Sequence, residues 1–190
     1  MARWEPNARQ RLVVAALDLF TEQGYDDTTV AEIAERAGLT KTTFFRHFPN
    51  KREVLFAGQD IHGRLVADGI AGAPEAATPL QAVAAGLDEV TASFTQAQRE
   101  FGPRLQAVIA GHTELQEREV FKRAHLAAAM TDALRKRGVE ELAANLAADL
   151  GARAFSRAFT RWVEPANERT FTELARQALD ELRNAIRALE

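Results

Sequence analysis

The sequence contains no cysteine, and it has one tyrosine and two tryptophans among 190 residues. The lack of cysteine excludes disulfide bonds, thiolate zinc sites and a cysteine nucleophile, and it is typical of a reducing compartment. No apolar run approaches the roughly 20 residues that span a bilayer, and the opening Met-Ala-Arg-Trp-Glu-Pro lacks the apolar core of a secretory signal. We therefore expect a globular, cytoplasmic protein without a membrane segment.

An excess of positive charge is also absent. The formal net charge is -3 at pH 7, which argues against indiscriminate binding to polyanions because nonspecific DNA affinity comes mainly from neutralised phosphates. Any nucleic-acid site must therefore be local.

Motifs for catalysis or metal binding are missing from the sequence as well. The four histidines, His47, His62, His112 and His125, show none of the close spacing expected of a helical metal site. There is no HExxH motif, nucleophile elbow or phosphate loop. We expect a protein that is not an enzyme and that has no metal and no cofactor.

Helical periodicity dominates the chain, and no stretch shows the sustained alternation of a strand. The sequence predicts an all-α fold of about nine helices, with an N-terminal helix-turn-helix head and a larger C-terminal helical bundle. The expected domains are 1–52, a connecting helix at 53–71 and a body at 72–190. The expected helices are 12–23, 29–37, 40–48, 50–69, 78–98, 103–110, 113–136, 139–164 and 167–189.

Two short helices separated by a glycine turn form a helix-turn-helix candidate at about 29–48. A helical wheel places Phe44 and Phe48 on the buried side, so Thr42, Thr43, Phe45 and Arg46 point outward. Such a face can enter the major groove, where threonine contacts base edges and arginine forks onto guanine. Charge on the outward face of a short helix is also most often simple solvation, so the pattern alone leaves DNA binding open.

The run "TVAEIAERAGLTKTTFFRHFPNKREVL", with the preceding "ALDLFTEQGYDDT", closely resembles the N-terminal DNA-binding region of TetR-family transcriptional regulators over roughly 50 residues. The resemblance implies an all-α homodimer that binds a palindromic operator in double-stranded DNA. It also implies a repressor that a small effector in the C-terminal domain releases from DNA.

The same resemblance assigns DNA contacts to the third helix and its neighbours. The family most often has tyrosine where this chain has Phe45, so a phosphate hydrogen bond is lost and the ring is left to contact sugar or a thymine methyl. The DNA-binding positions implied by the match are Thr29, Lys41, Thr42, Thr43, Phe45, Arg46, His47 and Lys51, of which Thr29 and Lys51 are phosphate contacts.

The second half of the chain matches nothing with comparable specificity. An apolar pocket for a small lipophilic effector is expected from Phe94, Leu105, Val108, Ile109, Phe121, His125 and Phe155, with His112 or His125 as the polar anchor. Wide apolar stripes on the last two helices favour a dimer interface of Phe159, Trp162, Phe171, Leu174, Ala178, Leu182 and Ile186. For each residue, ordinary core packing is the alternative.

A second function keeps DNA binding and omits the small molecule. In that alternative the C-terminal body serves only for dimerisation and docking, and the protein is controlled by a protein partner or acts architecturally. A tightly packed body would favour this alternative, whereas a dry cavity of several hundred Å³, of the size that holds small ligands, would favour the ligand-gated regulator.

Overall fold

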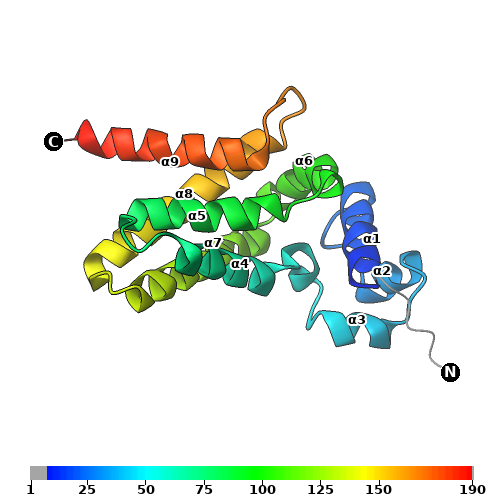
Figure 1. Ribbon diagram of the computed structural model, residues 1–190. Coiled ribbons are helices and arrows are strands. Elements are labelled where there is room, and N and C mark those ends of the chain that lie inside the picture. Colours follow the sequence, from blue (N-terminus) through cyan, green and yellow to red (C-terminus); the bar gives the residue numbers. More distant parts are fainter. Residues whose placement is uncertain (1–7, 190) are drawn as a thin grey trace. The chain divides into compact units, whose positions relative to one another are not determined.

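The structure is a computed structural model that describes residues 8–189. Within this range the chain forms nine α-helices and one 3-10 helix and contains no strand, which confirms the all-α prediction (Figure 1). No helix in the described range is both long and apolar enough to cross a bilayer. The elements are α1 (Ala8–Glu22), α2 (Val30–Arg36), α3 (Lys41–His47), η1 (Arg52–Phe56), α4 (Gln59–Gly72), α5 (Pro79–Ala92), α6 (Gln96–Ala110), α7 (Thr113–Lys136), α8 (Glu141–Trp162) and α9 (Phe171–Arg187).

The chain divides into two compact units. The first, called the head unit below, contains the described residues up to Ala57 together with Arg104–Glu119. The second, called the body unit, contains Gly58–Pro103 and the described residues from Val120 onward. This division differs from the expected domains at 1–52, 53–71 and 72–190, because a segment of α6 and α7 belongs to the head unit.

Capping hydrogen bonds fix the start of α2 in the head. The Thr29 hydroxyl accepts a hydrogen bond from the Glu32 backbone N–H at 3.2 Å, and the Glu32 carboxylate accepts one from the Thr29 N–H at 2.7 Å. This capping box satisfies two N–H groups at the start of α2. Gly38 ends the turn with φ of +65°, and a Cβ there would lie 2.7 Å from Nη2 of Arg11. The left-handed backbone conformation therefore favours glycine at this position, and a larger residue would also displace the end of the Arg11 side chain.

The expected helix over 50–69 is interrupted, which corrects the prediction of one connecting helix at 53–71. Asn50 accepts a hydrogen bond from the Glu53 N–H at 3.1 Å, but this bond begins only the short 3-10 helix η1. Gly58 has φ of +96°, a conformation that ends right-handed helices, and α4 begins at the next residue. The break coincides with the boundary between the two units.

The boundary between α5 and α6 also differs from the expectation. The sequence predicts a break at Gly102-Pro103, yet α6 continues through Pro103, and the break lies at 93–95. Thr95 and Gln98 form a capping box, with the Thr95 N–H donating to Oε1 of Gln98 at 2.8 Å. A Thr-x-x-Gln pattern is a start signal for a helix, and here it places the start of α6.

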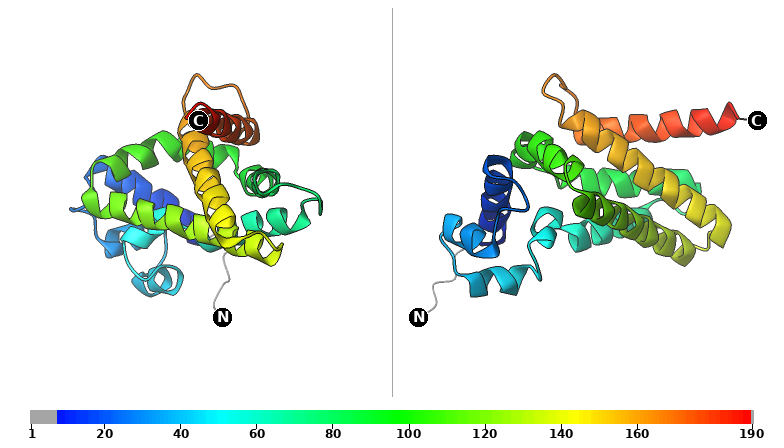
Figure 2. Two further views of the ribbon diagram at one scale, coloured as in Figure 1. Left: turned by 90° about the vertical axis from the view of Figure 1, so that its left-hand side faces the viewer. Right: turned by 180° about the vertical axis from the view of Figure 1, so that it is seen from behind.

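The body unit is built around close helix crossings. Helices α8 and α9 lie side by side, and α5 packs against both (Figure 1 and Figure 2). Helix α4 packs along α5, where a Cβ on Gly86 would lie 2.6 Å from the carbonyl oxygen of Val66. A Cβ on Gly151 of α8 would lie 2.5 Å from Cγ1 of Val83. Glycine at these positions lets the helices approach more closely than alanine would.

We predict that Gly86→Ala destabilises the body unit, because its methyl group would collide with the α4 backbone and force α4 and α5 apart. The expected cost is about 1–3 kcal/mol, as for overpacked cores, and it is measured by thermal or chemical unfolding. Gly72→Ala, in the last turn of α4, is the matched control because no atom lies within 4 Å of its added Cβ. Equal stability of the two variants would contradict the crossing geometry.

Candidate nucleic-acid interface

Helix α3 is held by two buried phenylalanines. Phe44 is fully buried and Phe48 is 2% exposed, and their ring centroids lie 5.6 Å apart. The Thr40 hydroxyl accepts a hydrogen bond from the Thr43 N–H at 3.1 Å and so caps the helix. The wheel prediction of the buried side is confirmed for both phenylalanines.

The opposite side of α3 faces outward. Lys41, Thr42, Phe45 and Arg46 are exposed, Phe45 by 48%, and Thr43 is half-buried. The Lys41 ammonium nitrogen lies 6.0 Å from the centroid of the Phe45 ring. No acidic side chain occurs in α3. The result is a short, positively charged, partly apolar ridge that can offer methyl, hydroxyl and guanidinium groups to base edges.

His47 is less available than its neighbours on α3. Its Nε2 atom is buried and has no hydrogen-bond partner in the described residues. Burial, then the positive charges of Arg46 and Arg9, lower the pKa of His47 below its ordinary value. The imidazole therefore tends to stay neutral, so a DNA contact from His47 would use its Nδ1 atom rather than an added charge.

Arg9 is a basic residue near α3 that the sequence reasoning missed. It lies in the first turn of α1, is exposed, and its guanidinium carbon lies 5.5 Å from the centroid of the Phe48 ring. Its position beside the C-terminal end of α3 is set by the packing of α1, so no local pattern reveals it.

The two side chains expected to contact phosphate are already bonded within the protein. The Lys51 ammonium donates to the carbonyl oxygens of Tyr25 at 2.5 Å, Thr28 at 2.9 Å and Asp26 at 3.4 Å. The Thr29 hydroxyl donates to the Glu32 carboxylate at 2.7 Å. A phosphate contact by either side chain stays a prediction, and it would require exchange of one of these bonds.

An ion pair joins η1 to the start of α7 inside the head unit. The Arg118 guanidinium donates through Nε and Nη2 to the two carboxylate oxygens of Glu53, both at 2.7 Å. The Arg118 and Glu53 side chains are only 13% and 19% exposed. The hydrogen bond from Arg118 holds the pKa of the Glu53 carboxyl below its usual value. In the same unit, the His112 ring lies 5.2 Å from the Tyr25 ring, and Arg104 pairs with Asp18.

The residues expected to line an effector pocket fall into both units. Leu105, Val108 and Ile109 belong to the head unit, and Phe94, Phe121, His125 and Phe155 belong to the body unit. Phe121 is 60% exposed and His125 is also exposed, whereas Phe155 is buried. His112, the other expected anchor, has its Nδ1 2.9 Å from the carbonyl oxygen of Val108.

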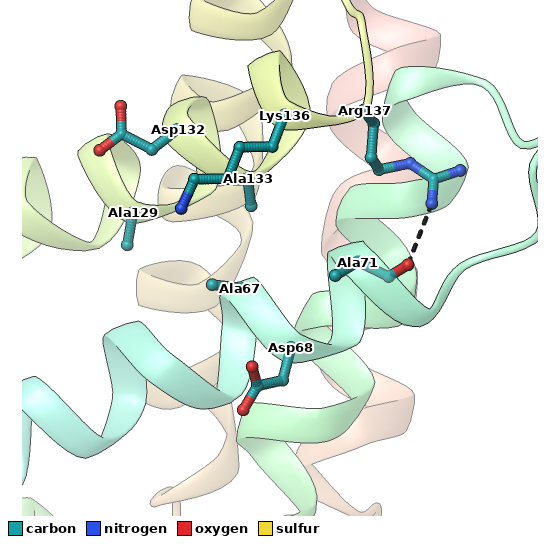
Figure 3. A pocket seen from close by; sticks show the side chains of 8 residues that line it. All are labelled: Ala67, Asp68, Ala71, Ala129, Asp132, Ala133, Lys136 and Arg137. Atoms are coloured by element: carbon teal, nitrogen blue, oxygen red, sulfur yellow. Dashed lines mark hydrogen bonds between the residues drawn. The ribbon is translucent and has the colours of Figure 1, made fainter.

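A pocket of about 470 Å³ lies between α4 and α7, and none of the expected effector residues line it (Figure 3). Four alanines form its apolar part, and the Arg137 guanidinium donates to the carbonyl oxygens of Ala71 at 3.2 Å, Ala73 at 2.8 Å and Pro74 at 2.6 Å. These bonds satisfy the C-terminal end of α4, so Arg137 has a structural role. The lining residues are Ala67, Asp68, Ala71, Ala129, Asp132, Ala133, Lys136 and Arg137.

The side chains expected at a dimer interface divide by exposure. Trp162, Phe171, Leu174 and Ala178 are buried in the core of the body unit, so this chain alone already covers them. Phe159 and Leu182 are half-buried, and Ile186 is 44% exposed. Leu142 and Leu146, one turn apart on α8, are 64% and 57% exposed. They enlarge the available apolar surface beyond the predicted set.

Comparisons with known proteins agree with this geometry. Residues 12–57 match the family described as bacterial regulatory proteins, tetR family. The chain is 39% identical over 75 residues to the HTH-type transcriptional regulator TcmR of Streptomyces glaucescens, an alignment that covers 40% of this chain and 33% of TcmR. It is 34% identical over 121 residues to the HTH-type transcriptional regulator BetI of Rhizobium meliloti, covering 63% of this chain and 57% of BetI. The chain thus spans less than two thirds of each relative.

A solved structure supports the fold over nearly the whole chain. The transcriptional regulator FadR from Bacillus subtilis superimposes with a TM-score of 0.56 at 19% identity, covering 91% of this chain and 96% of that protein. The likeness shows an all-α fold shared with TetR-type proteins, and α2 and α3 form the helix-turn-helix of the matched segment. Residues 12–57 match the TetR family, which supports the resemblance found in the sequence of this segment.

We predict opposite effects for the two adjacent phenylalanines of α3. Phe44→Ala should unfold or strongly destabilise the head, by about 3–5 kcal/mol, because it empties a fully buried site. Phe45→Tyr should leave stability unchanged and keep or tighten operator binding, because its hydroxyl would be added at an exposed position. Circular dichroism and DNA-binding assays measure the two effects, and equal loss of folding in both variants would refute the assignment of faces.

We predict that Glu53→Gln lowers the stability of the head at neutral pH by about 1–3 kcal/mol, because it leaves the half-buried Arg118 without its carboxylate partner. The folded-state pKa of Glu53 is depressed, so its stabilisation is complete above the ordinary value of 4.5 and is lost as pH falls through the lower folded value. Wild type should therefore lose more stability than the variant on acidification. Unfolding curves at a series of pH values measure this difference.

The exposed pair between Arg36 and Glu22 offers the control, since its side chains are 42% and 54% exposed. Glu22→Gln should leave stability nearly unchanged because water screens such a pair. Parallel pH profiles for wild type and Glu53→Gln would show that the Glu53–Arg118 pair does not stabilise the head.

Proposed function

We propose that this protein is a TetR-family repressor that binds a palindromic operator as a homodimer and is released by a small lipophilic effector. The exposed face of α3 carries the proposal, because Lys41, Thr42, Phe45 and Arg46 project from a helix whose direction is fixed by buried phenylalanines. Arg46 is the residue best suited to fork onto a guanine, and Thr42 and Thr43 offer methyl and hydroxyl groups. The protein acts by binding, and we assign it no catalytic step.

Surface that one chain leaves uncovered supports the proposed dimerisation. Leu142 and Leu146 on α8 and Ile186 on α9 are large apolar side chains that stay exposed in the isolated chain. A second copy that covers them would bring two α3 helices into a two-fold arrangement. The operator is then a palindrome whose half-sites are about 34 Å, or a multiple of that distance, apart.

Release by a ligand is supported by a cluster of aromatic side chains in the body unit, called the aromatic end below. Phe94 and Phe159 are half-buried, and their rings lie among those of Phe155, Trp162 and Phe171. This surface suits a lipophilic molecule. FadR from Bacillus subtilis, which has the same fold, was solved in complex with stearoyl-CoA. An effector releases DNA only through unequal affinity for the DNA-competent and DNA-incompetent states.

The second candidate function is a DNA-binding dimer without a small-molecule ligand, controlled by a protein partner or acting architecturally. The glycine crossings at Gly86 and Gly151 favour it, since α4, α5 and α8 pack too closely there to admit a ligand. The two candidates share the DNA site and differ in the use of the body unit.

Two experiments distinguish these functions. The first selects the sequences that the protein binds from random DNA, and the second tests a panel of lipophilic compounds for release of that DNA. We expect the selected sequence to be a palindrome, and we expect the bound protein to protect both of its half-sites. Arg46→Ala should weaken its binding by about 1–3 kcal/mol, whereas Arg36→Ala, on α2, should not. A single nonpalindromic preferred site would refute the dimeric operator. A palindrome that no compound releases would favour the second candidate.

A further inference from the structure

His62 is a buried polar side chain whose role the fold does not explain. It lies in the first turns of α4 and is 9% exposed, and its Nδ1 atom has no hydrogen-bond partner among the described residues. An unsatisfied buried polar atom costs about 1–3 kcal/mol, so its presence calls for a cause such as a ligand that supplies the missing bond. The polar anchors expected from the sequence were His112 and His125, not His62.

The surroundings of His62 are apolar and aromatic. Its ring stacks on Phe94, with centroids 4.8 Å apart and planes inclined by 27°. Phe94 in turn makes edge contacts with Phe155 and Phe171 at 5.8 and 5.0 Å. Phe94 is half-buried, so part of its ring reaches solvent, whereas Nδ1 of His62 is covered. A molecule that displaces the Phe94 ring would come close to His62.

The charge near His62 is positive. Burial first, and then the positive charge of Lys122 on α7, lower the pKa of His62 to about 4. No carboxylate contributes to this shift. A bound anion would therefore be attracted by Lys122, and it would accept a hydrogen bond from Nδ1 in the tautomer that carries its proton there.

We propose that Nδ1 of His62 is the polar anchor of the effector site, and that the effector is an apolar acid. Its carboxylate accepts a hydrogen bond from Nδ1–H, and its aromatic or acyl body lies against Phe94. Lys122 adds electrostatic attraction. This inference rests on the proposed ligand-gated function and narrows its effector to carboxylic acids.

The test compares matched acids and alcohols on the full chain. The probes are sodium 2-naphthoate with 2-naphthylmethanol, and sodium decanoate with 1-decanol. Calorimetry should show that at least one acid binds about tenfold or more tightly than its alcohol, as loss of a charge-assisted hydrogen bond predicts. NMR of the histidine Cε1–H signals should show an upward shift in the pKa of His62 when the acid binds, since a nearby negative charge favours the imidazolium.

Variants separate a binding role from a structural one. His62→Phe should weaken acid binding about 10- to 100-fold and leave the alcohol unaffected. His62→Asn, whose amide lies near the position of Nδ1, should recover part of the affinity even if His62→Phe folds poorly. Asp149→Asn, at an exposed position on α8, is the control and should bind as wild type does. Thermal unfolding of each variant confirms that it is folded.

Either of two results would overturn the inference. One is that neither acid binds at concentrations up to about 1 mM, which corresponds to very weak affinity. The other is that wild type and His62→Phe bind the acid with the same affinity. DNA release from the selected operator distinguishes this failure from failure of the proposed function. If an acid releases DNA equally from wild type and His62→Phe, the gating stands and the anchor is wrong. If an acid shifts the His62 signals but never releases DNA, the binding site stands and the gating fails.

Discussion

Burial of Phe44 and Phe48 is the interaction on which the DNA-facing surface depends. A helix of seven residues is too short to be stable by its own hydrogen bonds, so α3 exists because these two rings are packed in the head. The same packing fixes the rotation of the helix. A shift of one residue would turn every side chain by about 100° and move Phe45 toward the core. The direction of Thr42, Phe45 and Arg46 is therefore a consequence of the core behind them.

The head is completed by residues far away in the sequence. The segment Arg104–Glu119 belongs to the same compact unit as α1 to α3, and the Glu53–Arg118 pair and the Tyr25–His112 contact join it to them. Helices α6 and α7 each supply residues to both units. Coupling between a ligand and DNA requires a physically connected element with two arrangements. These two helices, together with the break at Gly58, are where the chain itself connects the units.

The sequence predicted what local chemistry controls and missed what distant packing controls. The all-α fold, the caps at Thr29 and Thr40, and the two faces of α3 follow from patterns within a few residues, and all are present. The helix break at Gly58 was missed because a lone glycine within a helical pattern does not reveal its φ. Trp162 and Phe171 were assigned to a dimer interface, yet they lie in the core of one chain, because an apolar stripe does not say which partner covers it. Lys51 reads as a surface cation, but the carbonyls that bind it come from residues about 25 positions earlier.

The body unit contains one region where helix spacing is fixed by close packing and another where the side-chain contacts can change. Between α4, α5 and α8 the contacts depend on glycines with no room for a methyl group, so a larger residue there would disturb helix spacing before it could shape a ligand site. At Phe94 the contacts are between rings, which slide and tilt at lower cost, and one ring is partly open to solvent. Selectivity among effector molecules can therefore vary at the aromatic end without disturbing the helix spacing. There His62 supplies a polar atom that lacks a partner among the described residues.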